Sequence, residues 1–206
     1  MIAESFLLAE VGDLLELDRH IFSLINAGAG PWLDQILPWW REKSNWIPLY
    51  TLIAFVFVHR FGWRGFALIA IAGLWVTVAD FTSSSIFKPW VGRLRPCNDP
   101  DFADQVRLLL EHCGSGKSFP SSHATNHFAL TVFLRQVFGR RWRFYTNLGM
   151  LWAAIIAFAQ VYVGVHYPFD ILVGALLGSI FGVLGASLLG LMRPDWRTDF
   201  SGAHPH

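Results

Sequence analysis

Five long apolar segments set the strongest limit on how this chain can fold. They cover residues 46–58, 66–87, 122–138, 144–165 and 169–192. About 20 apolar residues are enough to cross the hydrocarbon core of a bilayer as an α-helix. The chain is 53% hydrophobic and only 15% charged, whereas soluble domains carry about 25% charged residues. The sequence therefore predicts an all-α, polytopic membrane helix bundle of about five or six spans, which forms a single domain over residues 1–206.

The first 41 residues leave the number of spans open. Apolar residues 6–8, 11, 14, 15 and 17 recur at helical spacing with acidic residues between them. This pattern is typical of an amphipathic helix that lies at the membrane interface. Residues 21–25 and 32–40 are predicted to form short helices, separated by a turn at residues 28–31.

Arginines gather in three short connections of the predicted bundle: Arg60 and Arg64, then Arg140, Arg141 and Arg143, and finally Arg193 and Arg197. All three clusters fall on one side, which the positive-inside rule assigns to the cytoplasm. The connection at residues 88–120 and the turn at 164–168 then face outward. We expect a bacterial-type inner (plasma) membrane protein whose site faces the periplasm or the outside. A net charge of +1 gives no strong basic field, so nucleic acid is not an expected partner.

The two cysteines, Cys97 and Cys113, both lie in the outward connection. An oxidising compartment would permit a disulfide, which for a loop of about 15 residues stabilises the fold by about 3 kcal/mol in the chain-entropy model. Two free thiols are the alternative, and zinc binding with His112 fits no ordinary spacing. Between the cysteines, Pro100 can begin a helix with residues 102, 106 and 109 on one face, which ends at the glycines at 114 and 116.

Three cations follow the second predicted span, in Lys88-Pro-Trp-Val-Gly-Arg93-Leu-Arg95-Pro96. Positive residues are disfavoured on the outer side of a membrane, so this cluster favours anion binding over simple anchoring. Arginine offers a bidentate fork and lysine a point charge, a combination that suits phosphate. The third predicted span then opens with Pro120-Ser121-Ser122-His123, and a helix N-terminus presents free N–H groups to an anion.

A histidine and a carboxylate stand four residues apart at the start of the last predicted span. Asp170 is close enough to His166 to fix the tautomer of the imidazole if that turn is helical. Ionisable groups are costly at such a position, which indicates a functional site. With His123, the set matches phosphoryl transfer through a covalent histidine. One neutral histidine attacks phosphorus, a protonated one supplies the leaving oxygen with its proton, and cations stabilise the equatorial oxygens.

Two further residues are expected to support this chemistry from behind. His127 lies one turn after His123, but the glutamate that a zinc metalloprotease pattern needs is absent, so a packing or supporting role is expected. Asp80 lies two turns before Lys88 and is expected to pair with the motif cations or with the hydroxyls of residues 83–85.

Three segments together resemble the signature motifs of the type-2 phosphatidic acid phosphatase superfamily. They are Lys88-x6-Arg95-Pro96, Pro120-Ser121-Ser122-His123 and Gln160-x5-His166-x3-Asp170. This superfamily includes membrane lipid phosphate phosphatases, undecaprenyl-diphosphate phosphatases and lipid A phosphatases. The resemblance implies a bundle of about six membrane helices and hydrolysis without a cofactor or metal.

The resemblance also implies a role for each matching residue. His166 would be the nucleophile that forms phosphohistidine, Asp170 its orienting carboxylate and His123 the general acid. The phosphate would be held by Lys88, Arg95, Ser121 and the N–H groups near Ser122 and His123.

The chain departs from the family pattern at two positions. Ser122 stands where glycine is usual, and Gln160 stands where the third motif usually has arginine. Glutamine can donate a hydrogen bond to phosphate but brings no charge. We hypothesise that Arg93 also binds the phosphate and partly compensates.

The leading hypothesis is a membrane lipid phosphatase acting on undecaprenyl diphosphate, phosphatidic acid, phosphatidylglycerol phosphate or lipid A. A membrane anion transporter or channel is the alternative, although it predicts basic residues spread through several spans. A weakly active or inactive relative that binds lipid phosphate is the third, because of Gln160. The sequence leaves the oligomeric state open.

Overall fold

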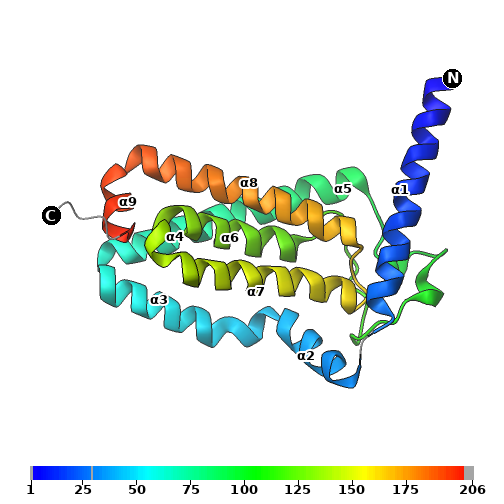
Figure 1. The fold of residues 1–206 in the computed structure, drawn as a ribbon, viewed down its shortest axis with the longest axis horizontal. Coiled ribbons are helices and arrows are strands. Elements are labelled where there is room, and N and C mark those ends of the chain that lie inside the picture. The colour runs from blue at the N-terminus through cyan, green and yellow to red at the C-terminus, as the bar shows by residue number, and fades with distance from the viewer. Residues whose placement is uncertain (1, 29, 202–206) are drawn as a thin grey trace.

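The computed structural model of the protein describes residues 2–28 and 30–201, with side chains at all of these except 2–9, 11, 197–199 and 201. The described residues form helices and no β-strand, which confirms the predicted all-α class (Figure 1). In chain order they are α1 (Ile2–Asn26), α2 (Pro31–Arg41), α3 (Ile47–Phe61), α4 (Trp63–Phe81), α5 (Lys88–Val91), α6 (Ser122–Phe138), α7 (Arg143–Tyr162), α8 (Pro168–Met192) and α9 (Pro194–Ser201).

Helices α3, α4, α6, α7 and α8 form the bundle, and α6 packs against α4, α7 and α8 (Figure 1). Each of the five predicted spans corresponds to one of these helices, and α6 begins and ends at the predicted residues. Within the described residues, three stretches are long and apolar enough to cross a membrane: Trp63–Val91, Arg140–Tyr162 and Pro168–Met192. Because α3 and α6 have only 15 and 17 residues, the number of spans stays a prediction.

Glycines at four-residue intervals bring α8 against α6. A methyl group at Gly178 would lie 2.1 Å from the carbonyl oxygen of Thr125, and one at Gly182 would lie 2.7 Å from that of Ala129. Small residues at this spacing let two membrane helices approach until their backbones touch. This contact fixes the start of α8, and with it the His166–Asp170 turn, beside the start of α6.

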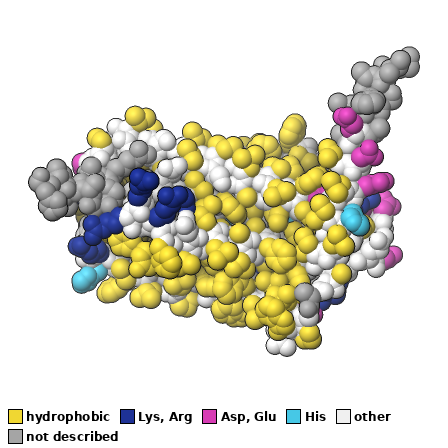
Figure 2. All heavy atoms as spheres, in the orientation of Figure 1, with side chains coloured by type: hydrophobic (Ala, Val, Ile, Leu, Met, Phe, Trp, Pro, Cys, Tyr) yellow, Lys and Arg dark blue, Asp and Glu magenta, His cyan; other side chains and the backbone are white. Residues whose placement is uncertain are grey.

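The bundle has a basic end and a site end. The α3–α4 connection, the α6–α7 connection and the end of α8 meet at the left of Figure 1, and lysine and arginine side chains gather there in Figure 2. The prediction that the arginine-rich connections share one side is confirmed; the Arg197 side chain lies outside the described ones. Hydrophobic side chains cover the middle of the same view, as suits a surface that faces lipid.

The N-terminal region differs from the prediction in one respect. Residues 21–25 do not form a separate helix, because α1 continues without a break to Asn26. The predicted helix at 32–40 is present as α2, which begins with Pro31, a residue suited to a first helical position. The interfacial placement of α1 stays a prediction, and its apolar side chains at 6–8 and 11 lie outside the described ones.

The connection between α5 and α6 is mostly irregular. The predicted helix from Pro100 is wrong, since a single 3₁₀ turn at Ala103–Gln105 takes its place. Backbone groups here bond to distant elements instead of along a helix: the amide of Leu109 donates to Val163 (3.2 Å) and that of Arg107 to the Asn26 side chain (2.8 Å). These bonds satisfy the buried backbone as a helix would and tie the loop to α1 and α7.

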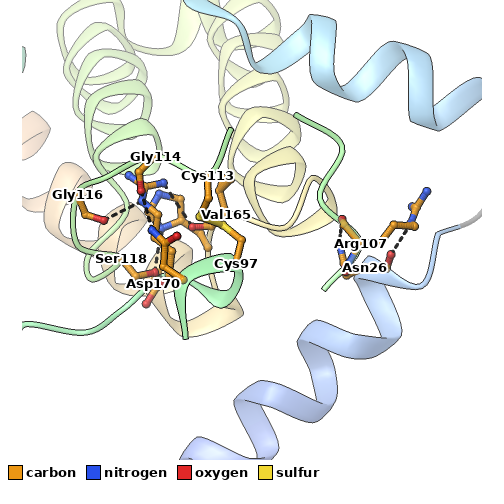
Figure 3. Close-up of a disulfide and its surroundings, with 12 residues drawn as sticks. Asn26, Cys97, Arg107, Cys113, Gly114, Gly116, Ser118, Val165 and Asp170 are labelled. Carbon is orange, nitrogen blue, oxygen red and sulfur yellow. Dashed lines mark hydrogen bonds and ion pairs between the residues drawn. A yellow bond between two sulfur atoms is a disulfide. The ribbon is translucent and has the colours of Figure 1, made fainter. Parts of the chain in front are cut away.

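Cys97 and Cys113 form a disulfide, with 5.9 Å between their Cα atoms (Figure 3). The predicted disulfide is confirmed. Both sulfur atoms that the alternative zinc site would need are bonded to each other. Next to the bond, the side chain of Asn98 donates to the carbonyl of Gly114 (3.0 Å). The disulfide therefore holds together the base of the loop that enters the candidate site.

Candidate active site

The predicted His166–Asp170 pair is formed in the turn between α7 and α8. Both residues are almost fully buried, and Nδ1 of His166 lies 3.4 Å from Oδ2 of Asp170. The same oxygen accepts a hydrogen bond from the backbone amide of Tyr167 (2.8 Å), which caps α8. A carboxylate at Nδ1 leaves Nε2 as the ring nitrogen able to react.

Ser118 is a member of this group that the sequence analysis missed. Its hydroxyl donates to Oδ2 of Asp170 and lies 3.4 Å from Nδ1 of His166. Its backbone amide donates to the carbonyl of Arg93 (2.8 Å). A serine two residues before a motif carries no distinct signal in one sequence, because its role depends on how the α5–α6 connection folds.

Asp170 also belongs to a network of charged side chains. The Arg93 guanidinium donates to Oδ1 of Asp170 (2.9 Å) and to Oδ2 of Asp18 in α1 (2.6 Å), and it stacks 4.0 Å over the ring of Tyr167. The other oxygen of Asp18 accepts from the backbone amide of Phe169 (2.9 Å). The predicted contact of Arg93 with phosphate stays a prediction; in this structure its guanidinium is bound by two buried carboxylates.

The charges of Lys88 and Arg95, the cations predicted to bind phosphate, act on His166. Arg95 is held by backbone carbonyls: its Nε donates to the carbonyl of Gly116 (3.0 Å) and its Nη1 to that of Val165 (3.4 Å). Within the part of the chain that the structure describes, the Lys88 ammonium has no hydrogen-bond partner. These cations therefore retain donors for an anion.

The start of α6 lies at the same place. Ser121 caps the helix, and its backbone amide donates to the carbonyl of Asp170 (2.9 Å). Its buried hydroxyl has no partner among the described residues. Ser122, the residue found in place of glycine, turns its hydroxyl sideways to that of Ser83 (3.0 Å). His123 follows in the first turn and lies near enough to His166 for the two charged forms to repel each other.

His127 and Asp80, expected to support the site, interact with motif residues or their neighbours. Nδ1 of His127 donates to the backbone carbonyl of His123 (2.7 Å), and its ring packs edge-on against Trp152. Asp80 accepts a hydrogen bond from the side chain of Asn126 (2.7 Å), and its charge acts on Lys88. The predicted bond to the serine hydroxyls is absent among the described contacts of its carboxylate, because Ser83 donates to the Asp80 backbone carbonyl instead.

Gln160 is fully buried and bonds to Arg41, a residue that the motifs did not point to. Its amide nitrogen donates to the carbonyl of Ile156 (3.3 Å) within α7, and its amide oxygen accepts from Nε of Arg41 (3.2 Å). One donor of the amide is thus used inside the helix, and the predicted bond of Gln160 to phosphate stays a prediction. Arg41 ends α2 directly after two tryptophans, a sequence that would equally suit an interfacial anchor.

Burial controls the charge state of the histidine. It lowers the pKa of His166 from 6.5 to about 4, against the opposing effect of Asp170. Burial also lowers the pKa of Arg95 and of Arg41, although arginine remains charged in proteins. A neutral imidazole therefore faces fixed positive charges. Among the described residues, no group of three or more histidine, cysteine or carboxylate side chains is placed to hold a metal ion.

Phosphoryl transfer is the chemistry that needs a neutral imidazole, a carboxylate behind it and cations in front of it. With an apolar belt around the bundle, the class of protein is a membrane-bound hydrolase of phosphoric esters. The sequence model of the PAP2 superfamily matches residues 63–192, and the chain belongs to this superfamily.

Known proteins similar to this chain are also phosphatases that act on lipids. The chain is 33% identical over 173 residues to a lipid A 4'-phosphatase of Bacteroides thetaiotaomicron, covering 83% of this chain and 76% of the relative. It is 29% identical to an undecaprenyl-diphosphatase of Sulfolobus acidocaldarius, covering 82% and 77%. Among solved structures it resembles LpxE of Aquifex aeolicus, with a TM-score of 0.61 and 27% identity over 82% of this chain and 93% of that one. The protein is thus a membrane lipid phosphatase of the PAP2 superfamily.

Proposed function

We propose that the protein removes a phosphate from a membrane lipid through a phosphohistidine on His166. The observation that supports this most is the buried, neutral imidazole whose Nδ1 lies 3.4 Å from the Asp170 carboxylate. With the proton held on Nδ1, the Nε2 lone pair attacks phosphorus and the bond from phosphorus to the lipid oxygen breaks. His123 supplies the proton to that oxygen, then takes one from the water that cleaves the phosphohistidine and releases inorganic phosphate.

The positive groups at the site stabilise the charge of the transferring phosphoryl group. Lys88, Arg95, the Ser121 hydroxyl and the amides that open α6 are the donors proposed for its equatorial oxygens. Arg93 acts indirectly, because its bond to Asp170 fixes the carboxylate that orients the nucleophile. Asp80 and His127 hold Lys88 and His123 in place from behind.

The phosphomonoester of lipid A is the first substrate we propose, on the likeness to a lipid A 4'-phosphatase over 83% of the chain. Undecaprenyl diphosphate is the second, on the likeness to an undecaprenyl-diphosphatase. Exposed apolar side chains beside the site, among them Trp90 (80% exposed) and Leu94 (40%), suit a substrate that arrives with its tails in the bilayer.

We further propose the inner membrane as the location, with the site on the periplasmic or outer side. The arginine-rich connections lie at the opposite end of the bundle from the site, and such connections stay in the cytoplasm. A disulfide at the site end agrees with an oxidising compartment.

The test is the release of inorganic phosphate by purified protein in detergent from four lipids: lipid A, undecaprenyl diphosphate, phosphatidic acid and phosphatidylglycerol phosphate. We expect lipid A to be the best substrate and His166→Ala to lower turnover by about 10³-fold or more. His112→Ala, a change at an exposed loop histidine (85% exposed), is the matched control and should not alter turnover. Equal phosphate release by the wild type and His166→Ala would refute the mechanism.

A second measurement identifies the intermediate. After rapid denaturation of a reaction with phosphorus-labelled lipid, the label should remain on the protein in alkali and be lost in acid, as a phosphoramidate bond requires. His166→Ala should carry no label. A label that persists in the variant would show that another residue is the nucleophile.

A further inference from the structure

We infer that Arg41, at the end of α2, binds the substrate phosphate and supplies the positive charge that the third motif lacks at Gln160. The inference builds on the proposed function, since it adds a phosphate-binding group to that site. It also removes the main reason for regarding the chain as an inactive relative.

The contact between the two residues is direct. Nε of Arg41 donates to the amide oxygen of Gln160 at 3.2 Å, across 119 residues of sequence. The amide nitrogen of Gln160 is held by the Ile156 carbonyl, so the side chain presents its oxygen to Arg41 as a fixed acceptor. Gln160 therefore positions a cation where the motif would ordinarily provide one.

The rest of the guanidinium remains available for a ligand. Arginine has five N–H donors in a rigid fork, and within the described residues Nε of Arg41 is the one with a partner. The guanidinium bonds to a residue of the third motif, and its charge acts on both the proposed general acid His123 and the proposed phosphate-binding residue Arg95. Cations that converge in this way repel one another unless an anion lies between them.

The end of α2 is held rigidly, so Arg41 does not reach the site by chance. The indole N–H of Trp46 donates to the carbonyl of Trp40 (2.7 Å), and their rings pack with centroids 4.8 Å apart. The Trp46 ring packs in turn on Trp152 of α7 (5.6 Å). Further along α2, Asp34 accepts a hydrogen bond from the Tyr162 hydroxyl (2.7 Å). These contacts dock α2 on α7 at both of its ends and preorganise the arginine.

Arg93 does not compete for this role. Its guanidinium bonds to Asp18 and Asp170, whereas no carboxylate among the described residues bonds to Arg41. A cation without a carboxylate partner is the one able to neutralise an incoming phosphate.

The decisive experiment measures phosphate affinity separately from catalysis. Binding of inorganic phosphate is measured by calorimetry on the His166→Ala protein, with and without Arg41→Gln. Because charge-assisted hydrogen bonds are the strong ones, we expect Arg41→Gln to raise the Kd by about 10- to 100-fold. In the otherwise native enzyme, kcat/KM for the lipid substrate should fall by a similar factor. The matched control is Lys43→Gln, which removes an exposed cation two residues away and should change neither quantity.

A charge exchange tests the position. The double variant Arg41→Gln with Gln160→Arg moves the positive charge from α2 to the third motif. Its phosphate affinity should recover to within about tenfold of that of the protein with Arg41 and Gln160 intact. Failure to recover would refute the idea that Arg41 occupies the place of the motif arginine. The thermal unfolding midpoint shows which variants are folded; should Arg41→Gln be unstable, Arg41→Lys is used, with an affinity expected between the two.

The two proposals fail in different ways. Unchanged phosphate affinity in Arg41→Gln, or an equal loss in Lys43→Gln, would overturn the role of Arg41 while leaving lipid hydrolysis intact. A wild-type protein that binds phosphate through Arg41 but releases none from any lipid would overturn the proposed function alone.

Discussion

Replacing Arg93 by glutamine should destabilise the site end of the protein strongly. The change leaves Asp18 and Asp170, both 0% exposed, close together with no cation between them. Removing one partner of a buried ion pair costs about 3–5 kcal/mol, since a charge stays buried without compensation. The Arg19–Asp99 pair is the comparison: its arginine is 40% exposed, and such surface pairs are worth about 0–1 kcal/mol.

The assay is the thermal unfolding midpoint of the purified protein in detergent. For a chain of this size, 1 kcal/mol corresponds to about 2–4 °C, so Arg93→Gln should lower the midpoint by about 6–20 °C and Arg19→Gln by about 4 °C at most. Adding Asp18→Asn to Arg93→Gln should recover part of the loss, because it removes one of the two stranded charges.

Kinetics separate the two roles that Arg93 could have. A residue that orients Asp170 should, when removed, lower kcat and leave KM nearly unchanged. A rise in KM at constant kcat would instead be evidence for the contact between Arg93 and phosphate that the sequence predicted. Midpoints of Arg93→Gln and Arg19→Gln within about 2 °C of each other would refute the reasoning from burial.

Two further predictions concern the nucleophile and the packing of the bundle. Because burial lowers the pKa of His166 from 6.5 to about 4, the acidic limb of kcat/KM should have its midpoint near pH 4. As pH falls, His166 is protonated in the unfolded chain at a higher pH than in the folded protein, so the free energy of unfolding should decrease between about pH 6.5 and 4. An acidic limb of kcat/KM near pH 6.5 would contradict the lowered pKa. Gly178→Ala sets a methyl group 2.1 Å from the Thr125 carbonyl and should abolish a monodisperse size-exclusion peak. Gly73→Ala, with nothing within 4 Å, should leave that peak unchanged, and equal behaviour of the two variants would contradict close α6–α8 packing.

The helices of the bundle were predictable because apolarity and length alone determine them. The limits of α6 agree to the residue, and those of α8 to within one residue. The connection between α5 and α6 was not predictable in the same way. Its residues near Pro100 have helical spacing, but the disulfide and the bond from Arg107 to Asn26 hold the chain in an irregular path. Tertiary contacts there outweigh local preference.

In the candidate site, too, contacts within one turn were predictable and contacts with distant segments were not. His166 and Asp170 are four residues apart, so their pairing follows from helical geometry within one turn. The partners of Arg93 and Gln160 lie 75 and 119 residues away, in α1 and α2. Spacing within a motif carries no information on such partners, and both N-terminal residues stand in segments whose membrane placement the sequence leaves open. The glycine repeat in α8 is different, since its four-residue spacing is a packing signal visible in the sequence itself.

The N-terminal helices complete a site that the family motifs leave unfinished. The match to the PAP2 superfamily begins at residue 63, yet Asp18 and Arg41 both precede it and both bond to motif-region side chains. Asp18 offsets the charge of Arg93 beside Asp170, and in the role proposed above Arg41 binds the phosphate. Loss of the arginine from the third motif is then tolerable because the bundle receives an equivalent charge from α2. The chemistry of this chain therefore depends on how its first 41 residues dock on α7 and α8, as much as on the three motifs.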